Sequence, residues 1–374
     1  MTSLALLLSA SLLDPATPTP IHAAGLDDVV LYEPLGRIDP AQIDDQGIHV
    51  LSLMGREDLA IAHRDYERGT CPTDPTADPM ALILERAAQT RIVIINEQHT
   101  RSRSRLTTAQ LIPALHDLGY RHLALEAFSN PPSDTGSVTL KDGKPRELDG
   151  GYTREPTFAA VLREAGERGW QFHAYEIIHD EESLALSPLD RTNRREQAQA
   201  NNLVRVLAAM PADEKLLIHV GYSHGMETPY DLGEDGTIHW MGLRLAAATG
   251  IDPLTISQVD CVHDGSGLRL VTDPDRQREG YDLTVAIPAE RLVEGRPAHR
   301  VEAMGLEPRA IPTAWRPATG WHVIEVRGPG MGLDEVPLDR IAIHASETTL
   351  PAYLVPAEGD HEVRIIAVAD APGD

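Results

Sequence analysis

Runs of apolar residues alternate with amphipathic segments through the middle of this chain. Ile92 to Ile95 are four β-branched apolar residues in a row, a pattern typical of a strand buried on both faces of a parallel sheet. Further strands are predicted at 122–127, 171–175, 215–220, 254–259 and 283–287, and helices at 106–118, 157–168, 190–210 and 240–248. This alternation predicts an α/β protein, an α/β/α sandwich with a mixed, mainly parallel sheet.

The two ends of the chain have a different pattern. Helical periodicity at 58–68 and 79–88 predicts helices that pack ahead of the first strand. The last predicted strands follow one another without helices, at 322–326, 340–344 and 361–368. We therefore predict an α/β domain over residues 25–294 and a smaller β-rich region over residues 295–374.

Residues 4–13 form an apolar segment that is too short to span a bilayer, and a Pro/Thr stretch ending in His22-Ala23-Ala24 follows it. This pattern predicts a signal peptide over residues 1–24, a periplasmic or secreted protein, and no membrane span in the mature chain. Cys71 and Cys261 are compatible with one disulfide in an oxidising compartment, and equally with two buried thiols.

The formal net charge is -24 and the pI is about 5.0. An acidic surface repels phosphate backbones and anionic lipids, so nucleic acid and membrane surfaces are not expected as partners. Residues 129–153 are rich in Pro, Gly, Ser and Asp, which predicts a long surface loop of the kind that often serves as a lid or a binding loop.

Acids and histidines recur where the predicted strands end. Because open α/β sheets bind their ligands at the carboxyl ends of their strands, we expect these side chains to share one pocket. The residues concerned are Glu97, His99, Glu126, Glu176 and His224.

Two kinds of chemistry fit these residue types. Glu97, His99, Glu126 and His224 can hold a divalent metal ion that lowers the pKa of a bound water. Alternatively, a histidine acts directly as a general base, with its tautomer fixed by a neighbouring carboxylate. In both cases Arg195, on the predicted helix 190–210, can stabilise a developing oxyanion.

A third alternative is a serine nucleophile. Gly221-Tyr222-Ser223-His224-Gly225 matches the G-x-S-x-G nucleophile elbow and follows a predicted strand. An elbow needs a helix that begins at the serine, whereas Pro229 and the Gly/Asp-rich segment 231–236 oppose a long helix here. Ser223 is therefore the less favoured nucleophile.

Several short motifs together resemble one superfamily. They are Asn-Glu-Gln-His at 96–99, Leu-Glu-Ala-Phe at 125–128, Ala-Tyr-Glu at 174–176, Arg195-Glu196 with Ala200 and Asn202, and Val-Gly-Tyr-Ser-His-Gly at 220–225. Over residues 90–260 the chain resembles the superfamily of ChaN-like haem-uptake lipoproteins, Tiki/TraB proteins and erythromycin esterases, which implies an EreA/ChaN-like fold. The resemblance also implies that Glu97, His99, Glu126, Arg195 and His224 line the active pocket.

Two functions follow from the residues and the resemblance. The first is a hydrolase in which histidine- and carboxylate-activated water attacks an ester or amide of a small molecule or peptide, with or without the help of a divalent metal. Glu176, Asn202 and Tyr222 are then expected to bind the substrate. The second is a non-enzymatic haem-binding protein for iron uptake, as in the ChaN-like branch.

Overall fold

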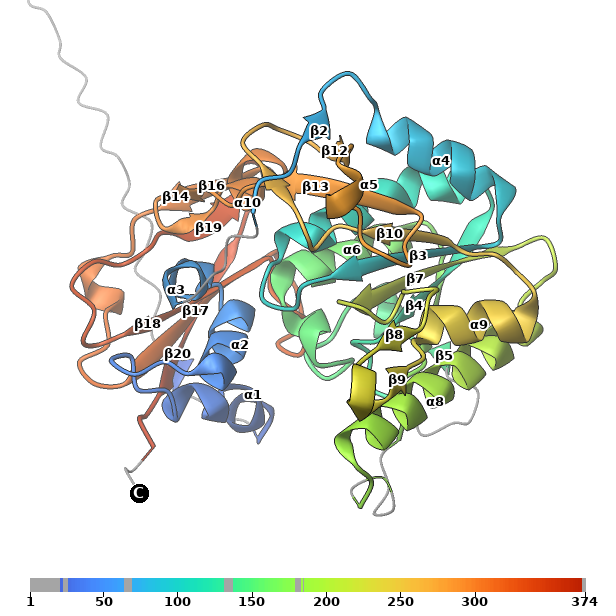
Figure 1. Ribbon diagram of the computed structural model, residues 1–374. Helices are drawn as coiled ribbons and strands as arrows, with labels where there is room; N and C mark the ends of the chain where they lie inside the picture. The colour runs from blue at the N-terminus through green and yellow to red at the C-terminus, as the bar shows by residue number, and fades with distance from the viewer. Residues whose placement is uncertain are drawn as a thin grey trace, which may run out of the picture.

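A large, mainly parallel sheet organises the computed structural model, which describes residues 21–22, 26–63, 69–130, 137–178, 183 and 185–371 (Figure 1). Its strand order is β2-β12-β13-β10-β3-β7-β4-β6-β5, and β11 also pairs with β13. The strands are β2 (Thr73–Asp74), β12 (Arg269–Val271), β13 (Leu283–Pro288), β11 (Val262–His263), β10 (Leu254–Ser257), β3 (Ile92–Glu97), β7 (Lys215–Gly221), β4 (Tyr120–Leu125), β6 (Gln171–Ala174) and β5 (Ser137–Val138). Pairing is parallel from β13 to β6 and antiparallel at both edges, which confirms the predicted α/β class.

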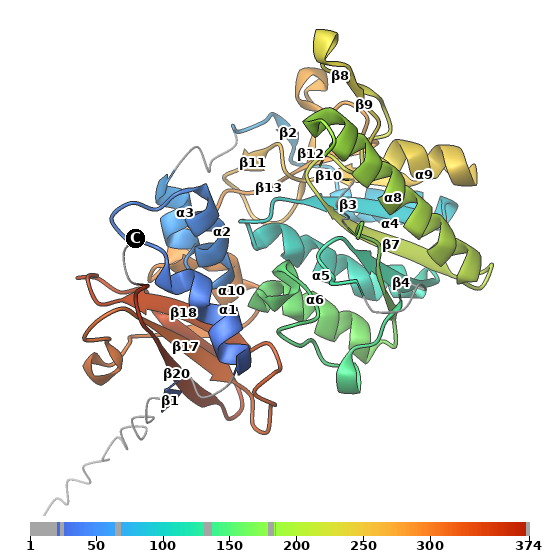
Figure 2. The ribbon, with the colours of Figure 1, turned by 90° about the horizontal axis from the view of Figure 1, so that it is seen from below.

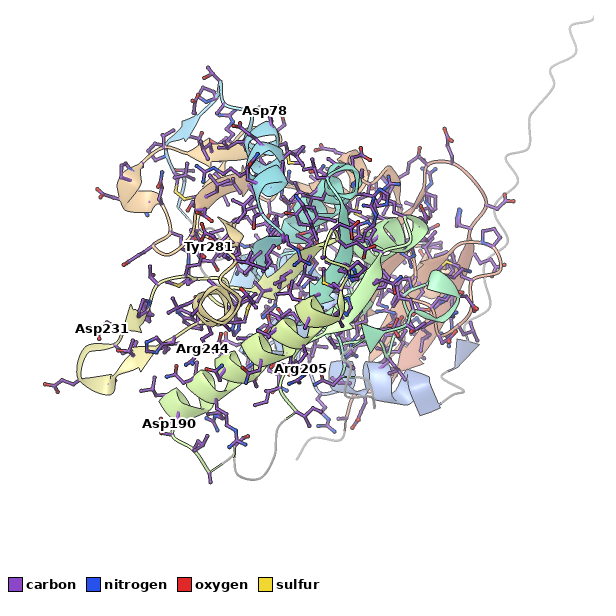
Figure 3. The ribbon with its side chains drawn as sticks, turned by 90° about the vertical axis from the view of Figure 1, so that its right-hand side faces the viewer. Asp78, Asp190, Arg205, Asp231, Arg244 and Tyr281 are labelled. Carbon is purple, nitrogen blue, oxygen red and sulfur yellow. A yellow bond between two sulfur atoms is a disulfide. The ribbon has the colours of Figure 1, made fainter. Side chains whose placement is uncertain are left out.

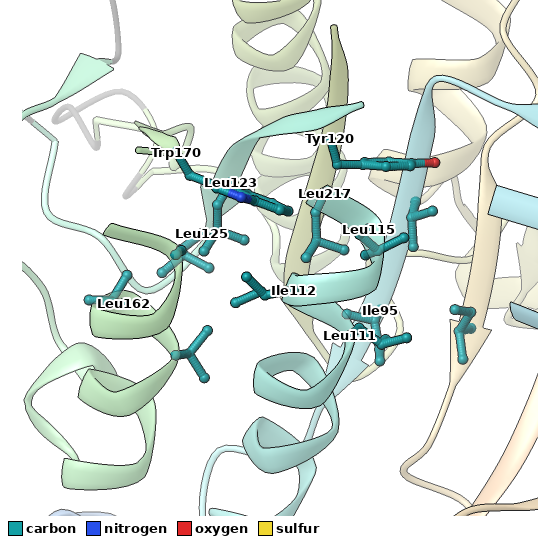
Figure 4. Close-up of a cluster of buried hydrophobic side chains, with 14 of the residues drawn as sticks. Ile95, Leu111, Ile112, Leu115, Tyr120, Leu123, Leu125, Leu162, Trp170 and Leu217 are labelled. Atoms are coloured by element: carbon teal, nitrogen blue, oxygen red, sulfur yellow. The ribbon is translucent and has the colours of Figure 1, made fainter. Parts of the chain in front are cut away.

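Helices cover both faces of this sheet. On one face lie α4 (Pro79–Gln89), α5 (Arg103–Asp117) and α6 (Pro156–Glu167), and on the other lie α8 (Pro188–Ala209) and α9 (Met241–Thr249). The apolar run in β3 packs against both helical layers, because Val93 and Ile95 face α4–α6 while Ile92 and Ile94 face α8 and α9. Figure 4 shows Ile95 in the first of these clusters, with Leu111 of α5 and Leu162 of α6. Each fully buried aliphatic side chain of this kind contributes roughly 1.5–3 kcal/mol.

The second part of the molecule is an accessory lobe, made of residues 21–22, helices α1–α3 and residues 292–371. Its four-stranded sheet has the order β1-β20-β17-β18, with β1 (Ile21–His22), β20 (Glu362–Val368), β17 (Trp321–Arg327) and β18 (Asp339–His344). The other elements are α1 (Leu26–Gly36), α2 (Asp45–Leu53), α3 (Glu57–His63), β14 (Leu292–Val293), β15 (Arg296–Pro297), α10 (Ala298–Glu302), β16 (Leu306–Arg309) and β19 (Tyr353–Pro356).

The N-terminal helices pack against the C-terminal sheet (Figure 2). Leu35 and Leu51 of α1 and α2 share one apolar cluster with Trp321 and Val323 of β17. The sequence predicted instead that the N-terminal helices pack ahead of the first strand, which holds for α4 alone. Residues 1–20, 23 and 24 of the predicted signal peptide lie outside the described residues.

One set of contacts joins the lobes through Arg340. Arg340 of β18 donates to the backbone oxygen of Arg154 at 3.1 Å and also pairs with Glu147, so the accessory lobe contacts the segment that carries Tyr152.

Cys71 and Cys261, both beside the large sheet, form a disulfide. This observation decides between the two alternatives left open by the sequence. No helix in the described part of the chain is long and apolar enough to cross a membrane.

Candidate active site

A pocket of about 400 Å³ lies where β3, β4, β6 and β7 end. Parallel register brings these ends together, since Glu97 at the end of β3 is paired with Gly221 at the end of β7. The pocket is lined by His99, Glu126, Ala127, Gly151, Tyr152, Glu176, Arg195, Tyr222 and His224. The residues expected to converge at this edge therefore do so, with Glu97 buried directly behind His99.

A buried carboxylate holds the imidazole of His99. Glu97 Oε1 lies 2.9 Å from His99 Nδ1, and Arg105 Nε donates to Glu97 Oε2 at 2.6 Å. His219 Nε2 lies 3.2 Å from the same Oε2. Burial raises the pKa of Glu97, but Arg105 and the two histidines hold it well below its usual value, so the carboxylate is ionised at neutral pH. An ionised Glu97 accepts a hydrogen bond from Nδ1–H, which leaves Nε2 of neutral His99 with a free lone pair.

Two tyrosines and a glycine surround the imidazole ring. Tyr152 stacks on His99 with 4.2 Å between ring centroids and 7° between planes, and Tyr222 meets it at 5.1 Å and 90°. A Cβ atom on Gly221 would lie 2.5 Å from His99 Cε1 and 2.7 Å from Nε2. Glycine is therefore required at 221 by the close approach of the ring.

Replacement of Gly221 by alanine is expected to displace the His99 ring. A misplacement of about 1 Å in catalytic geometry can cost roughly 100-fold in rate, so kcat/KM should fall on that order. Kinetics of Gly221→Ala should be compared with those of Gly69→Ala, where an added Cβ meets open space. Equal kinetics for the two variants would show that ring placement at 221 does not matter.

Tyr222 has a strained backbone. Its φ of 38° is in the left-handed region, which costs a non-glycine residue roughly 1–3 kcal/mol and is commonest at functional sites. Asn96 Nδ2 and the Tyr281 hydroxyl both donate to the Tyr222 carbonyl oxygen at 2.8 Å (Tyr281 is labelled in Figure 3). These bonds hold the Tyr222 ring at the pocket wall.

Arg195 of α8 joins two of the strand-end carboxylates. Its Nε donates to both oxygens of Glu176 at 3.1 Å, and its Nη2 donates to Glu126 and to Glu176. Its Nη1 lies 3.1 Å from His224 Nε2. Burial lowers the pKa of Arg195, but hydrogen bonds and charges of Glu176 and Glu126 raise it above its usual value. The pocket thus holds a permanent, rigidly placed positive charge.

Glu196, fully buried on α8, supports His224. Glu196 Oε1 lies 2.7 Å from His224 Nδ1, and its Oε2 accepts a hydrogen bond from the Met241 backbone N–H at 2.8 Å. His224 Nε2 lies 3.6 Å from Glu126 Oε1. Burial lowers the pKa of His224, but Glu126 and Glu196 raise it above the usual value for histidine. The two carboxylates therefore stabilise the imidazolium form of His224 relative to that of a histidine in water.

This raised pKa predicts a pH-dependent contribution to stability. A histidine with a raised folded-state pKa stabilises the fold fully below its unfolded pKa of about 6.5, and this contribution is lost as pH rises through the folded value. The melting temperature of the parent minus that of His224→Gln should therefore be largest near pH 6 and shrink toward pH 9. A difference that grows with pH would contradict the assignment.

Other sequence-predicted residues have different surroundings. Asn202 does not line the pocket in the described structure, because its Nδ2 donates to the backbone oxygens of Tyr175 and Glu176 at 2.8 and 3.2 Å. It positions the end of β6 instead of contacting a ligand. Ser223 Oγ accepts a hydrogen bond from Arg278 Nη2 at 2.6 Å.

The predicted metal site needs correction. No group of three or more His, Cys, Asp or Glu residues is arranged to hold a metal ion in the described parts of the chain. The physical reason is that Glu97 and His99 bond to each other, while the Arg195 guanidinium contacts both Glu126 and His224. The four proposed ligands are thus divided into two hydrogen-bonded groups, and the second already contains a cation.

Some functional residues were not identified from the sequence. Arg105 lowers the pKa of Glu97 and so keeps its carboxylate ionised. Arg105 also pairs with Glu155 at 3.1 Å, and the Glu155 side chain caps the N-terminus of α6. Tyr152 comes from the predicted surface loop 129–153, in which nothing marks it as a partner for His99. Glu196 could have been recognised from the sequence, because it follows Arg195 in the Arg195-Glu196 motif, but no role was predicted for it.

Comparison with known proteins gives only distant structural likenesses. No protein-family model and no curated protein sequence matches this chain. The type III effector HopBA1 has a TM-score of 0.39 and 14% identity over 59% of this chain and 98% of its own. RRSP, a MARTX toxin effector domain from Vibrio vulnificus, has a TM-score of 0.35 and 15% identity over 69% of this chain and 53% of its own. A structure described as bacterial protein toxins has a TM-score of 0.34 and 18% identity over 50% of this chain and 37% of its own.

These comparisons correct the resemblance drawn from the short motifs. The neighbours found are effector and toxin domains, not ChaN-like, Tiki/TraB or erythromycin esterase proteins, and no family model supports that superfamily. The haem-uptake function that depended on this resemblance is therefore withdrawn. The motifs were two to six residues long, and a strand-end Glu or His recurs in many unrelated α/β proteins.

Proposed function

We propose that this protein is a hydrolase in which His99 activates a water molecule to attack an ester or amide of a small molecule or peptide. The observation that carries the proposal is the pairing of His99 Nδ1 with the ionised, buried Glu97. That pairing leaves Nε2 as a proton acceptor on a residue that lines a pocket large enough for a small ligand.

The proposed reaction uses the two sides of the pocket differently. His99 Nε2 removes a proton from water while the oxygen attacks the carbonyl carbon, and Glu97 stabilises the imidazolium that forms. Arg195 and His224 stabilise the negative charge that develops on the carbonyl oxygen. When the intermediate collapses, the imidazolium of His99 returns its proton to the leaving oxygen or nitrogen. A positioned base contributes about 10²–10⁴-fold and one oxyanion donor about 10²–10³-fold.

Ser223 is expected to be dispensable. Its hydroxyl accepts from Arg278, whose Nη1 also pairs with Asp260 at 2.5 Å, so it is held in a structural network. Ser223→Ala should keep kcat/KM within about threefold of the parent, as expected for a residue outside the chemistry. Loss of several orders of magnitude, together with a covalent adduct from a serine-directed phosphonate, would instead identify a serine nucleophile.

A substrate panel tests the proposal. Purified protein is assayed on chromogenic esters of short and branched acids and on fluorogenic peptide amides, next to Glu97→Gln and the exposed-residue control Glu358→Gln. We expect hydrolysis by the parent and by Glu358→Gln, and strong loss in Glu97→Gln, which cannot stabilise the His99 imidazolium as an anion does. No hydrolysis of any member, or full activity in Glu97→Gln, would refute the proposed function.

We also propose a periplasmic or secreted location. The Cys71–Cys261 disulfide supports it, because structural disulfides persist mainly in oxidising compartments.

A further inference from the structure

The hydroxyl of Tyr152 has no hydrogen-bond partner among the described residues. Four other tyrosines donate their hydroxyl hydrogen to a protein oxygen, namely Tyr32, Tyr120, Tyr175 and Tyr281. Tyr152 is partly exposed and lines the pocket. Because a tyrosine hydroxyl withdrawn from bulk water usually has a partner, the Tyr152 hydroxyl is a donor that remains available to a bound ligand.

The Tyr152 ring is held in place from several directions. It stacks on His99 with 7° between the ring planes, and the guanidinium carbon of Arg105 lies 5.9 Å from its centroid. His49, contributed by α2 of the accessory lobe, has its ring centroid 6.5 Å from that of Tyr152. The Tyr152 carbonyl oxygen accepts a hydrogen bond from the Glu155 backbone N–H at 3.0 Å. The hydroxyl is therefore positioned before a ligand binds, which lowers the entropic cost of using it.

The surroundings of Tyr152 keep its hydroxyl protonated. Burial raises the pKa of Tyr152, and the negative charges of Glu126 and Glu97 raise it further, against the lowering effect of Arg105. The hydroxyl is thus a neutral hydrogen-bond donor throughout the neutral pH range.

The stack also places the hydroxyl on the side of the pocket that holds the base. The centroids of the Tyr152 and His99 rings are only 4.2 Å apart, so a group on the Tyr152 ring stays close to the imidazole. In the proposed reaction the leaving atom of the substrate must approach His99 to take the proton of the imidazolium. Arg195 and His224, which lie 3.1 Å apart, are assigned instead to the carbonyl oxygen. The leaving atom is therefore the part of the substrate that the Tyr152 hydroxyl can best reach.

We propose that the Tyr152 hydroxyl is a further catalytic group, which donates a hydrogen bond to the leaving atom as its bond to the carbonyl carbon breaks. This inference rests on the proposed hydrolase function. The leaving oxygen or nitrogen takes the electron pair of the broken bond and the proton of the His99 imidazolium, while Tyr152 keeps its own proton. The hydrogen bond stabilises the negative charge that develops on the leaving atom before that proton arrives.

A series of substrates with one acyl group and different leaving groups tests the inference. Tyr152→Phe keeps the ring and its stack on His99 and removes only the hydroxyl. We expect its kcat/KM to fall about 10–100-fold for the ethyl ester and the amide, the effect of one hydrogen bond to a charged atom. For the p-nitrophenyl ester, whose leaving group departs as a stable anion, the fall should be less than about twofold.

The matched control is Tyr230→Phe, because Tyr230 of β8 (Tyr230–Asp231) is 48% exposed and lies outside the pocket lining. It should match the parent on every substrate. The ratio of kcat/KM between two substrates is measured on one protein sample, so a loss of folded Tyr152→Phe protein does not alter it.

Three results would contradict the inference, and they identify which proposal fails. An equal fall of kcat/KM for every leaving group in Tyr152→Phe would mean that the hydroxyl does not act on the leaving atom. Unchanged kinetics in Tyr152→Phe would mean that the hydroxyl has no role in the reaction. Either result would overturn this inference and leave the hydrolase proposal, whereas no hydrolysis of any member by the parent would overturn both.

Discussion

Replacement of His99 by alanine is expected to lower kcat/KM by about 10²–10⁴-fold, the usual contribution of a positioned general base. The melting temperature should change little, because the buried Glu97 keeps Arg105 and His219 as partners after the imidazole is removed. Active sites commonly hold groups at a cost in stability, so a small rise in melting temperature is also consistent with this account. We therefore expect His99→Ala to lose most of its activity while its melting temperature stays close to that of the parent.

The measurement combines initial rates on the substrate panel with calorimetric melting. His361→Ala is the matched control, since His361 is an exposed histidine of the accessory lobe and its loss should affect neither quantity. A His99→Ala protein that is destabilised but fully active would mean that His99 only supports the turn after β3.

The second large effect concerns the disulfide. Cys71 and Cys261 are 190 residues apart in sequence, so the bond restricts a long loop of the unfolded chain. Removing a native disulfide commonly costs about 2–5 kcal/mol. For a chain of 374 residues this loss lowers the melting temperature by roughly 3–6 °C, given an unfolding entropy of about 2 cal/mol/K per residue.

Calorimetry of the double variant Cys71→Ser/Cys261→Ser measures this effect, with a thiol reductant added to the parent as an independent route to the same state. The reductant should shift the parent and leave the double variant unchanged. Identical melting of parent and variant, each without reductant, would indicate that the bond does not contribute to stability.

The central sheet could be predicted because its signals are local. The apolar run 92–95 needs no distant partner to be recognised, and β3 indeed covers Ile92–Glu97. The acids and histidines after the strands could be placed at one edge because parallel strands end together. Boundaries were less accurate, since β4 ends at Leu125, which leaves Glu126 in the turn where it contacts Arg195.

The accessory lobe and the aromatic side of the pocket could not be predicted in the same way. Packing of Leu35 against Trp321 joins residues almost 300 positions apart, and apolar periodicity shows that a helix face is buried without showing what covers it. Tyr152 stacks on His99 in a loop that Arg340 of the accessory lobe contacts at Glu147 and at the Arg154 backbone oxygen. These contacts between the two lobes form only in the folded chain, so no local sequence pattern predicts them.

The superfamily resemblance failed for a related reason. Short motifs with an acid or a histidine at a strand end occur in many unrelated α/β proteins. Their presence here therefore did not show that the chain belongs to one family. The side-chain geometry does not depend on that assignment. Glu97, His99, Arg195 and His224 still meet at one pocket, and the roles given to them follow from their hydrogen bonds and charges.

The central claim, that Glu97 fixes His99 with a free Nε2, can be tested without knowing the substrate. Nitrogen-15 NMR of the histidine rings, with the His99 signals identified by their loss in His99→Gln, reports which ring nitrogen carries the proton. We expect Nδ1–H and an unprotonated Nε2 at pH 8, and disturbance of this tautomer in Glu97→Gln. An Nε2–H tautomer of His99 in the parent, unaltered by Glu97→Gln, would contradict the assignment of His99 as the base.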